Sequence, residues 1–78
     1  MSTVLRVDGQ RFFFYSNESN EPPHIHVQKG EKYAKFWLVP VRVAESIDFT
    51  NRELRYVQSI ITEHLDQLRE AWEEYHAQ

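Results

Sequence analysis

The chain has 78 residues, enough for one small hydrophobic core and too few for two. Its composition, 41% hydrophobic and 27% charged with two Gly and three Pro, excludes a disordered, collagen-like or low-complexity chain. No Cys is present, which excludes disulfides, thiolate zinc sites and Cys nucleophiles. Without a long apolar run or the basic and apolar parts of a signal peptide, we expect a single cytoplasmic domain over residues 1–78.

The net charge of −3 is unevenly distributed along the chain. Residues 1–47 carry six Lys or Arg and five Asp or Glu, whereas residues 48–78 carry three and seven. Non-specific DNA binding depends on counterion release by an excess of cations, so this balance argues against it. A local basic face is compatible with the same numbers.

The first fifteen residues predict a β-hairpin. Residues 3–7 are apolar and β-branched, residues 10–15 resume an extended pattern, and Asp8 and Gly9 between them tolerate the positive φ angles of a two-residue turn. The expected cross-strand pairs are Val7 with Gln10, Leu5 with Phe12 and Thr3 with Phe14.

Two more strands follow a polar loop at residues 16–23, which ends in two prolines. Residues 24–29 alternate in polarity, with Ile25 and Val27 on one side and His24 and His26 on the other. Residues 33–39 alternate again after a turn at residues 30–32, and Pro40 ends or interrupts that strand. Residues 41–47 fit either a strand or a helical turn, and the sequence leaves this choice open.

The last third of the chain predicts one long helix, about residues 51–76. Thr50 and Glu53 have the spacing of a capping box, and Phe49 is placed to pack against Leu54. An apolar stripe recurs every three or four positions: Leu54, Val57, Ile61, Leu65, Leu68, Trp72 and Tyr75. The acidic residues on the other side, from Glu63 to Glu74, are typical of a solvated helix surface.

These elements predict an α+β fold in the order ββββα. Two hairpins, with strands within residues 3–39, form a four-stranded antiparallel sheet, and the long helix covers one face of it. The covered face is expected to carry Leu5, Val7, Phe12, Phe14, Ile25, Val27, Phe36 and Leu38. The uncovered face is expected to carry Val4, Phe13, Tyr15, Tyr33, Trp37, Arg6, Arg11, Lys35, His24 and His26. Aromatic surfaces of this kind are typical of partner-binding sites.

His24 and His26 are the candidate catalytic residues. Side chains two apart on a strand share a face, with Cβ atoms about 6–7 Å apart. Because an ordinary imidazole titrates near pH 6.5, the two could serve as acid and base in phosphodiester cleavage, with Arg11 or Lys35 steadying the phosphate. The simplest alternative is that both are polar residues of an ordinary strand.

A divalent metal site is a second reading of the same histidines. Further ligands would have to come from Glu18, Glu21 or His64, and a metal site normally needs at least three protein ligands. We expect no bound metal or cofactor, and we expect His64 to pack and hydrogen-bond locally beside the apolar stripe.

The aromatic and cationic residues of the uncovered face fit two kinds of partner. They could stack on unpaired bases while neutralising phosphates, as sheet-surface binders of single strands do. They equally fit a protein interface, in which aromatic residues and Arg are enriched. The small number of cations favours protein over nucleic acid.

Three stretches of the sequence resemble a known bacterial family. They read Phe12-Phe13-Phe14-Tyr15-Ser16-Asn17-Glu18, Glu21-Pro22-Pro23-His24-Ile25-His26-Val27 and Ala34-Lys35-Phe36-Trp37-Leu38, and they resemble the signature of the domain-of-unknown-function four-one-six-zero family. The resemblance covers nearly the whole chain, including Glu70-Ala71-Trp72. It implies a small bacterial protein, often encoded beside a partner of the two-four-four-two family of unknown function in a toxin–antitoxin-like arrangement. It implies no agreed catalytic residues.

We therefore expect an interaction protein from a toxin–antitoxin-like pair. It would dock a small partner protein through the uncovered face and the Glu-Pro-Pro-His-Ile-His region, using Arg11, Phe13, Tyr15, Asn17, Glu18, Glu21, Tyr33, Lys35 and Trp37. An RNA-acting toxin enzyme that uses His24 and His26, and a divalent-metal-binding module, are the alternatives. We expect no membrane association, and a homodimer stays open.

Overall fold

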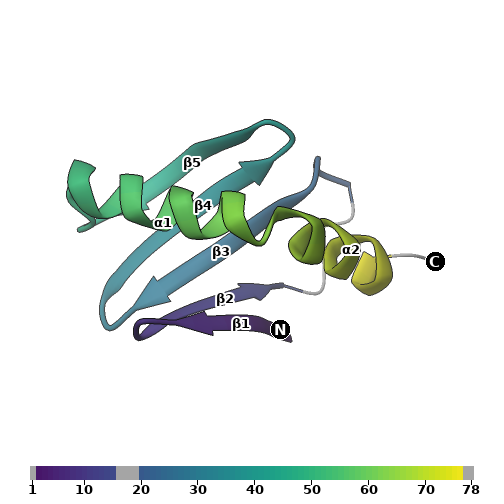
Figure 1. Ribbon diagram of the computed structural model, residues 1–78, viewed down its shortest axis with the longest axis horizontal. Coiled ribbons are helices and arrows are strands. Elements are labelled where there is room, and N and C mark those ends of the chain that lie inside the picture. Colours follow the sequence, from purple (N-terminus) through teal and green to yellow (C-terminus); the bar gives the residue numbers. More distant parts are fainter. Residues whose placement is uncertain (1, 16–19, 77–78) are drawn as a thin grey trace.

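A computed structural model describes residues 2–15 and 20–76 of the chain. Five strands form one antiparallel sheet in sequence order: β1 (Ser2–Val7), β2 (Gln10–Phe14), β3 (His24–Lys29), β4 (Lys32–Leu38) and β5 (Val41–Ile47). Two helices, α1 (Asn51–Glu63) and α2 (Leu65–His76), lie on one side of this sheet (Figure 1). The expected α+β fold, with an antiparallel sheet and a C-terminal helical cover, is confirmed.

The expectation of four strands is wrong, because residues 41–47 form a fifth. β5 runs back along the whole of β4, from the pair Leu38 and Val41 to the pair Tyr33 and Ile47. The chain reverses at Val39 and Pro40, which are joined by a cis peptide bond. As a strand, residues 41–47 hydrogen-bond their backbone groups to the edge of β4, whereas as a single helical turn most of these groups would lack partners. This is why the segment forms a strand and not a helical turn.

The expectation of one long helix is also wrong, because the helix is interrupted at His64. The His64 backbone has φ −108° and ψ 22°, and its N–H donates to the carbonyl oxygens of Ile60 and Ile61 at 3.1 and 3.2 Å. A straight helix over residues 51–76 would be about 39 Å long, whereas the longest extent of the molecule is 36 Å. Figure 1 shows the change of direction between α1 and α2. It keeps Leu68 and Trp72 packed on the core.

The first hairpin is formed as expected at its turn and differs at its open end. Asp8 and Gly9 have φ angles of 52° and 77°, and Val7 pairs with Gln10. Beyond Leu5, the extra residue Val4 shifts the register, so Thr3 pairs with Phe13 rather than with Phe14. Such a bulge turns the side chain of the extra residue, and Val4 packs against the core instead of lying on the outer face.

The core lies between the helices and the inner face of the sheet. Its buried members are Phe12, Phe14, Ile25, Val27, Ala34, Phe36, Leu38, Val57, Ile60, Ile61, Leu68 and Trp72. Most of these residues belong to the predicted inner face and helix stripe, whereas Ala34 and Ile60 do not. At the start of α1 the capping box is present in full: Glu53 N–H donates to Thr50 Oγ1 and Thr50 N–H donates to Glu53 Oε1.

Across the described ranges, neither helix has the length and apolar character needed to cross a membrane.

Candidate functional site

The face of the sheet that the two helices leave uncovered (Figure 1) carries a cluster of aromatic rings. Phe13 of β2 stacks on His26 of β3 with ring centroids 5.5 Å apart. Tyr15 meets the edges of both rings, at 5.3 and 4.6 Å, and Tyr33 of β4 stacks on the other side of His26 at 5.9 Å. The cross-strand pairing of Phe13 with His26, and the period-two positions of the other rings, bring together residues that are distant in the sequence. We call these four residues the outer aromatic cluster.

Two cations lie over aromatic rings of this face. The Arg11 guanidinium carbon is 4.2 Å from the centre of the Phe13 ring, and Nζ of Lys35 is 4.7 Å from the centre of the Trp37 ring. Both distances fit cation–π contacts. The same cations make polar contacts, so each is held in one orientation.

The polar contacts of Arg11 join three strands. Arg11 Nε donates to Thr3 Oγ1 at 2.9 Å on β1, and Nη1 donates to Gln28 Oε1 at 3.2 Å on β3. Thr3 and Gln28 are residues that the sequence analysis did not select. Alternation along β3 places Gln28 on the face that holds His26, whereas Thr3 reaches this face only because the bulge at Val4 pairs it with Phe13.

Lys35 ties the segment before β3 to the face. Its Nζ lies 2.6 Å from Glu21 Oε1, and the Lys35 side chain is only 13% exposed. The backbone N–H of Leu38 also donates to the carbonyl oxygen of Pro23 at 3.0 Å. Glu21, predicted as a binding residue and as a possible metal ligand, forms an ion pair with Lys35. Asn17 and Glu18, the other predicted residues of this segment, lie outside the described residues.

Both histidines are buried, which corrects the expectation that they lie on an open surface. His24 has no exposed area and His26 is 2% exposed, as is Phe13. Rings from β2 and β4 flank His26 on both sides, and His26 Nδ1 hydrogen-bonds with the Tyr33 hydroxyl at 2.8 Å. On this face, Tyr15 is exposed and Arg11, Tyr33, Lys35 and Trp37 are half-buried.

His24 also contacts the helix layer, which the sequence pattern did not predict. Its ring centroid is 4.7 Å from that of Trp72 in α2, 5.0 Å from His26 and 5.8 Å from Trp37. β2 and β3 stop pairing at Phe13 and His26, so at this end the sheet is open between its two faces. The ring of His24 therefore lies between the outer aromatic cluster and α2.

Hydrogen bonding fixes one proton of His24. Its Nδ1 is 2.9 Å from the carbonyl oxygen of Pro22, and because a carbonyl only accepts, Nδ1 carries the hydrogen. His64, considered as a metal ligand, uses its Nδ1 in the same way on the Ile60 carbonyl oxygen at 2.9 Å. The expected local hydrogen bonding of His64 is confirmed.

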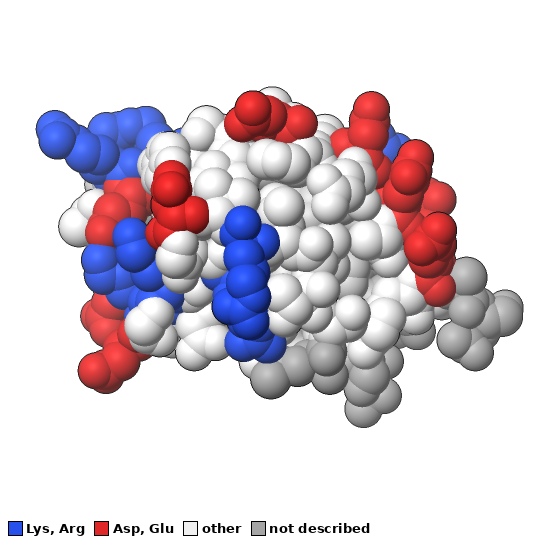
Figure 2. Space-filling model, turned by 60° about the horizontal axis from the view of Figure 1, so that its bottom comes forward, with Lys and Arg blue, Asp and Glu red and all other residues white. Residues whose placement is uncertain are grey.

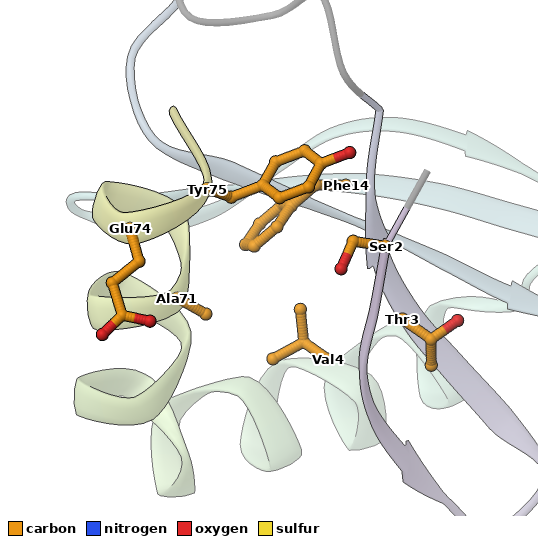
Figure 3. Close-up of a pocket in the computed structure, with 7 residues that line it drawn as sticks. All are labelled: Ser2, Thr3, Val4, Phe14, Ala71, Glu74 and Tyr75. Atoms are coloured by element: carbon orange, nitrogen blue, oxygen red, sulfur yellow. The ribbon is translucent and has the colours of Figure 1, made fainter. Parts of the chain in front are cut away.

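One hollow of the surface has neither His24 nor His26 in its lining. It has a volume of about 350 Å³ and is lined by Ser2, Thr3, Val4, Phe14, Ala71, Glu74 and Tyr75. Figure 3 shows β1 on one side of it and α2 on the other, with the Phe14 and Tyr75 rings together at one end. Among the described residues that line it, Glu74 is the sole charged one, and these residues supply no pair of groups for acid–base chemistry.

The described residues contain no group of three or more His, Asp or Glu that could hold a metal ion. Together with the burial of His24 and His26, the arrangement supplies aromatic surface and oriented cations rather than an open pair of imidazoles.

These features define a class: a small α+β protein whose five-stranded antiparallel sheet has a helical layer on one face and an aromatic, cation-bearing face on the other. The family model described as domain of unknown function (DUF4160) matches residues 9–73, and the chain belongs to that family. No curated protein and no solved structure matched the chain.

Proposed function

We propose that this protein is an interaction module that binds a small partner protein through the helix-free face of its sheet. In this proposal it is one member of a bacterial two-protein, toxin–antitoxin-like pair, and the partner belongs to the two-four-four-two family of unknown function. The observation that carries the proposal is the outer aromatic cluster with its flanking cations. Aromatic residues and Arg contribute most of the binding energy at protein interfaces.

The ordering of this face supports the proposal. Arg11 is held by Thr3 and Gln28, and Lys35 is held by Glu21, so their positions are set before a partner arrives. An interface whose side chains are already ordered loses less conformational entropy on binding. The exposed Tyr15 and the half-buried Tyr33 and Trp37 are the rings of this face that a partner would reach.

Charge favours a protein partner over RNA. Lys35 is paired with Glu21, which lowers the positive charge that this face offers to phosphates. Acidic groups gather at the end of the molecule that carries α2 (Figure 2), and they would repel a polyanion passing that end.

The test uses Tyr15→Ser and Trp37→Ser, separately and combined. Phe13 is unsuitable because it is buried, and truncating it would disturb the fold. Tyr56→Ser is the matched control, since Tyr56 is 46% exposed against 43% for Tyr15 and lies in the helix layer. The partner encoded beside the gene is purified, and its affinity for each variant is measured by calorimetry.

We expect the double variant to bind at least about tenfold more weakly and the control to bind like the wild type, since loss of an interface aromatic costs about 1–2 kcal/mol or more. Circular dichroism must show that each variant is folded. Equal affinity of all folded variants would overturn the proposal. Binding of single-stranded RNA that both substitutions abolish, without binding of the protein partner, would replace it with the RNA alternative.

A further inference from the structure

β5 is the most exposed strand of the sheet, and it lies at its edge. Only Val41 is half-buried, and the other six residues are exposed. Three of the six large hydrophobic side chains that the described residues expose belong to β5 or to the turn before it: Val39 at 54%, Val43 at 40% and Ile47 at 56%. β5 pairs only with β4, so its outer edge presents backbone groups to solvent (Figure 1).

A bulge in β5 places two opposite charges on the same side of the strand. Arg42 pairs with Trp37 and Glu45 pairs with Lys35, and Ala44 is the extra residue between these pairs. Trp37 and Lys35 are two apart on β4 and share the helix-free face, so Arg42 and Glu45 also share it. In a regular strand, residues three apart would lie on opposite faces.

The two charged side chains of β5 therefore lie at equal distances on either side of the bulge. Arg42 lies one step before Val43 and Ala44, and Glu45 lies one step after them. If a second β5 runs antiparallel about a two-fold axis at the bulge, Arg42 lies opposite Glu45 of the partner subunit, and the reciprocal pair forms by symmetry. Both pairs point to the helix-free face, on which cross-strand partners of opposite charge attract.

We propose that two copies of this protein associate through their β5 edges, in the register that places Arg42 opposite Glu45 of the partner subunit. The two sheets become one continuous sheet of ten strands, and Val41 lies opposite Ser46 of the partner subunit on the helix side. The exposed apolar side chains Val43 and Ile47 gain cross-strand neighbours on the partner subunit and lose part of their exposed area.

Charged side chains and bulges at a sheet edge can also prevent edge-to-edge pairing. Whether the charges on the edge have the same or opposite sign distinguishes an edge that prevents pairing from one that promotes it. An edge that is kept apart by charge carries like charges, which repel in every antiparallel self-pairing. β5 carries one charge of each sign, placed symmetrically about the bulge. In the described part of the chain neither Arg42 nor Glu45 forms an ion pair of its own.

The test is sedimentation equilibrium of the full chain and of three variants: Arg42→Glu, Glu45→Arg and the double reversal. Both positions are exposed, so the variants should fold, and thermal unfolding checks this. The wild type should sediment with twice the mass of one chain. Each single reversal puts two like-charge pairs across the axis and should weaken self-association roughly tenfold. The double reversal should restore it.

A mixture of the two single-reversal variants decides the register. Each weakens its own homodimer, but together they form two attractive pairs, so the mixture should contain a heterodimer with near wild-type affinity. A wild type that stays monomeric at high protein concentration would overturn the proposal. A dimer that neither single reversal weakens, or single variants that do not rescue each other, would also overturn it, because the contact would then lie elsewhere or in another register.

Discussion

The ring of His24, at the start of β3, lies 4.7 Å from the ring of Trp72, in the second helix. This contact joins the helix-free face to the helix layer, because His24 also contacts His26 and Trp37. It depends on the break in the helix at His64 and on the end of pairing between β2 and β3. The Glu-Pro-Pro-His-Ile-His segment therefore has a structural role as well as any part in binding.

His24→Ala should lower the free energy of unfolding by about 2–4 kcal/mol, because it leaves a cavity beside Trp72 and removes the hydrogen bond to Pro22. Urea unfolding followed by Trp fluorescence measures the change. Lys29→Ala is the control on the same strand, since Lys29 is exposed, and should cost about 0.5 kcal/mol or less. A loss below about 1 kcal/mol for His24→Ala would contradict the packing role.

Thr50→Ala should destabilise the protein by about 1 kcal/mol through loss of the N-cap of α1. Its hydroxyl accepts the N–H of Glu53 at 3.1 Å, and alanine leaves that donor to solvent. Thr62→Ala, an exposed substitution within α1, is the matched control and should change stability little. Thermal unfolding of both variants makes the comparison, and equal melting temperatures would count against a cap contribution.

Glu53 should make stability depend on acidic pH. The hydrogen bond from Lys32 Nζ, 2.5 Å away, followed by that from the Thr50 backbone, lowers the pKa of the Glu53 carboxyl below its ordinary 4.5. The unfolded state therefore binds the proton first, so this contribution is present above pH 4.5 and is lost as the pH falls through the folded pKa.

Glu53→Gln keeps a capping side chain but removes the charge, so the acid loss of stability should become smaller. Lys32→Met, which removes the first cause of the shift, should have the same effect. Urea unfolding between neutral and acidic pH compares the three proteins. Parallel pH profiles for all of them would show that this ion pair does not contribute.

Tyr56 should make the stability of the protein fall as the pH rises in the alkaline range. It donates a hydrogen bond to Asp8 Oδ2 in the β1–β2 turn, and this bond raises the pKa of the Tyr56 hydroxyl above 10.0. The stabilisation is fully present below pH 10.0 and is lost as the pH rises through the folded pKa. Ultraviolet titration of tyrosinate in the wild type and Tyr56→Phe isolates this group. Asp8→Asn should bring its midpoint down, and an unchanged midpoint would contradict the contact.

The local sequence pattern predicted much of the fold. Residues that alternate along the strands gave the two sheet faces, and the box at Thr50 and Glu53 gave the start of the first helix. Val4 was assigned to the wrong face because a bulge changes the alternation by one residue, and no residue type marks that bulge in the sequence. The same kind of shift in β5 brings Arg42 and Glu45 to one face.

For the candidate site, the sequence identified the rings and cations that share the helix-free face, because period-two alternation is a local property of the backbone. The sequence could not predict how far these side chains are exposed to solvent. Whether His24 and His26 face water depends on Phe13, Tyr33 and Trp72, which arrive from other strands and from the second helix.

By itself, then, the sequence determined four of the five strands, the helical character of the last third of the chain and most of the side chains that share a face, since these follow from backbone geometry and short-range periodicity. Only the tertiary structure decided the fifth strand, the break at His64 and the burial of the histidines. These depend on contacts between distant segments, whose free energies outweigh weak local preferences.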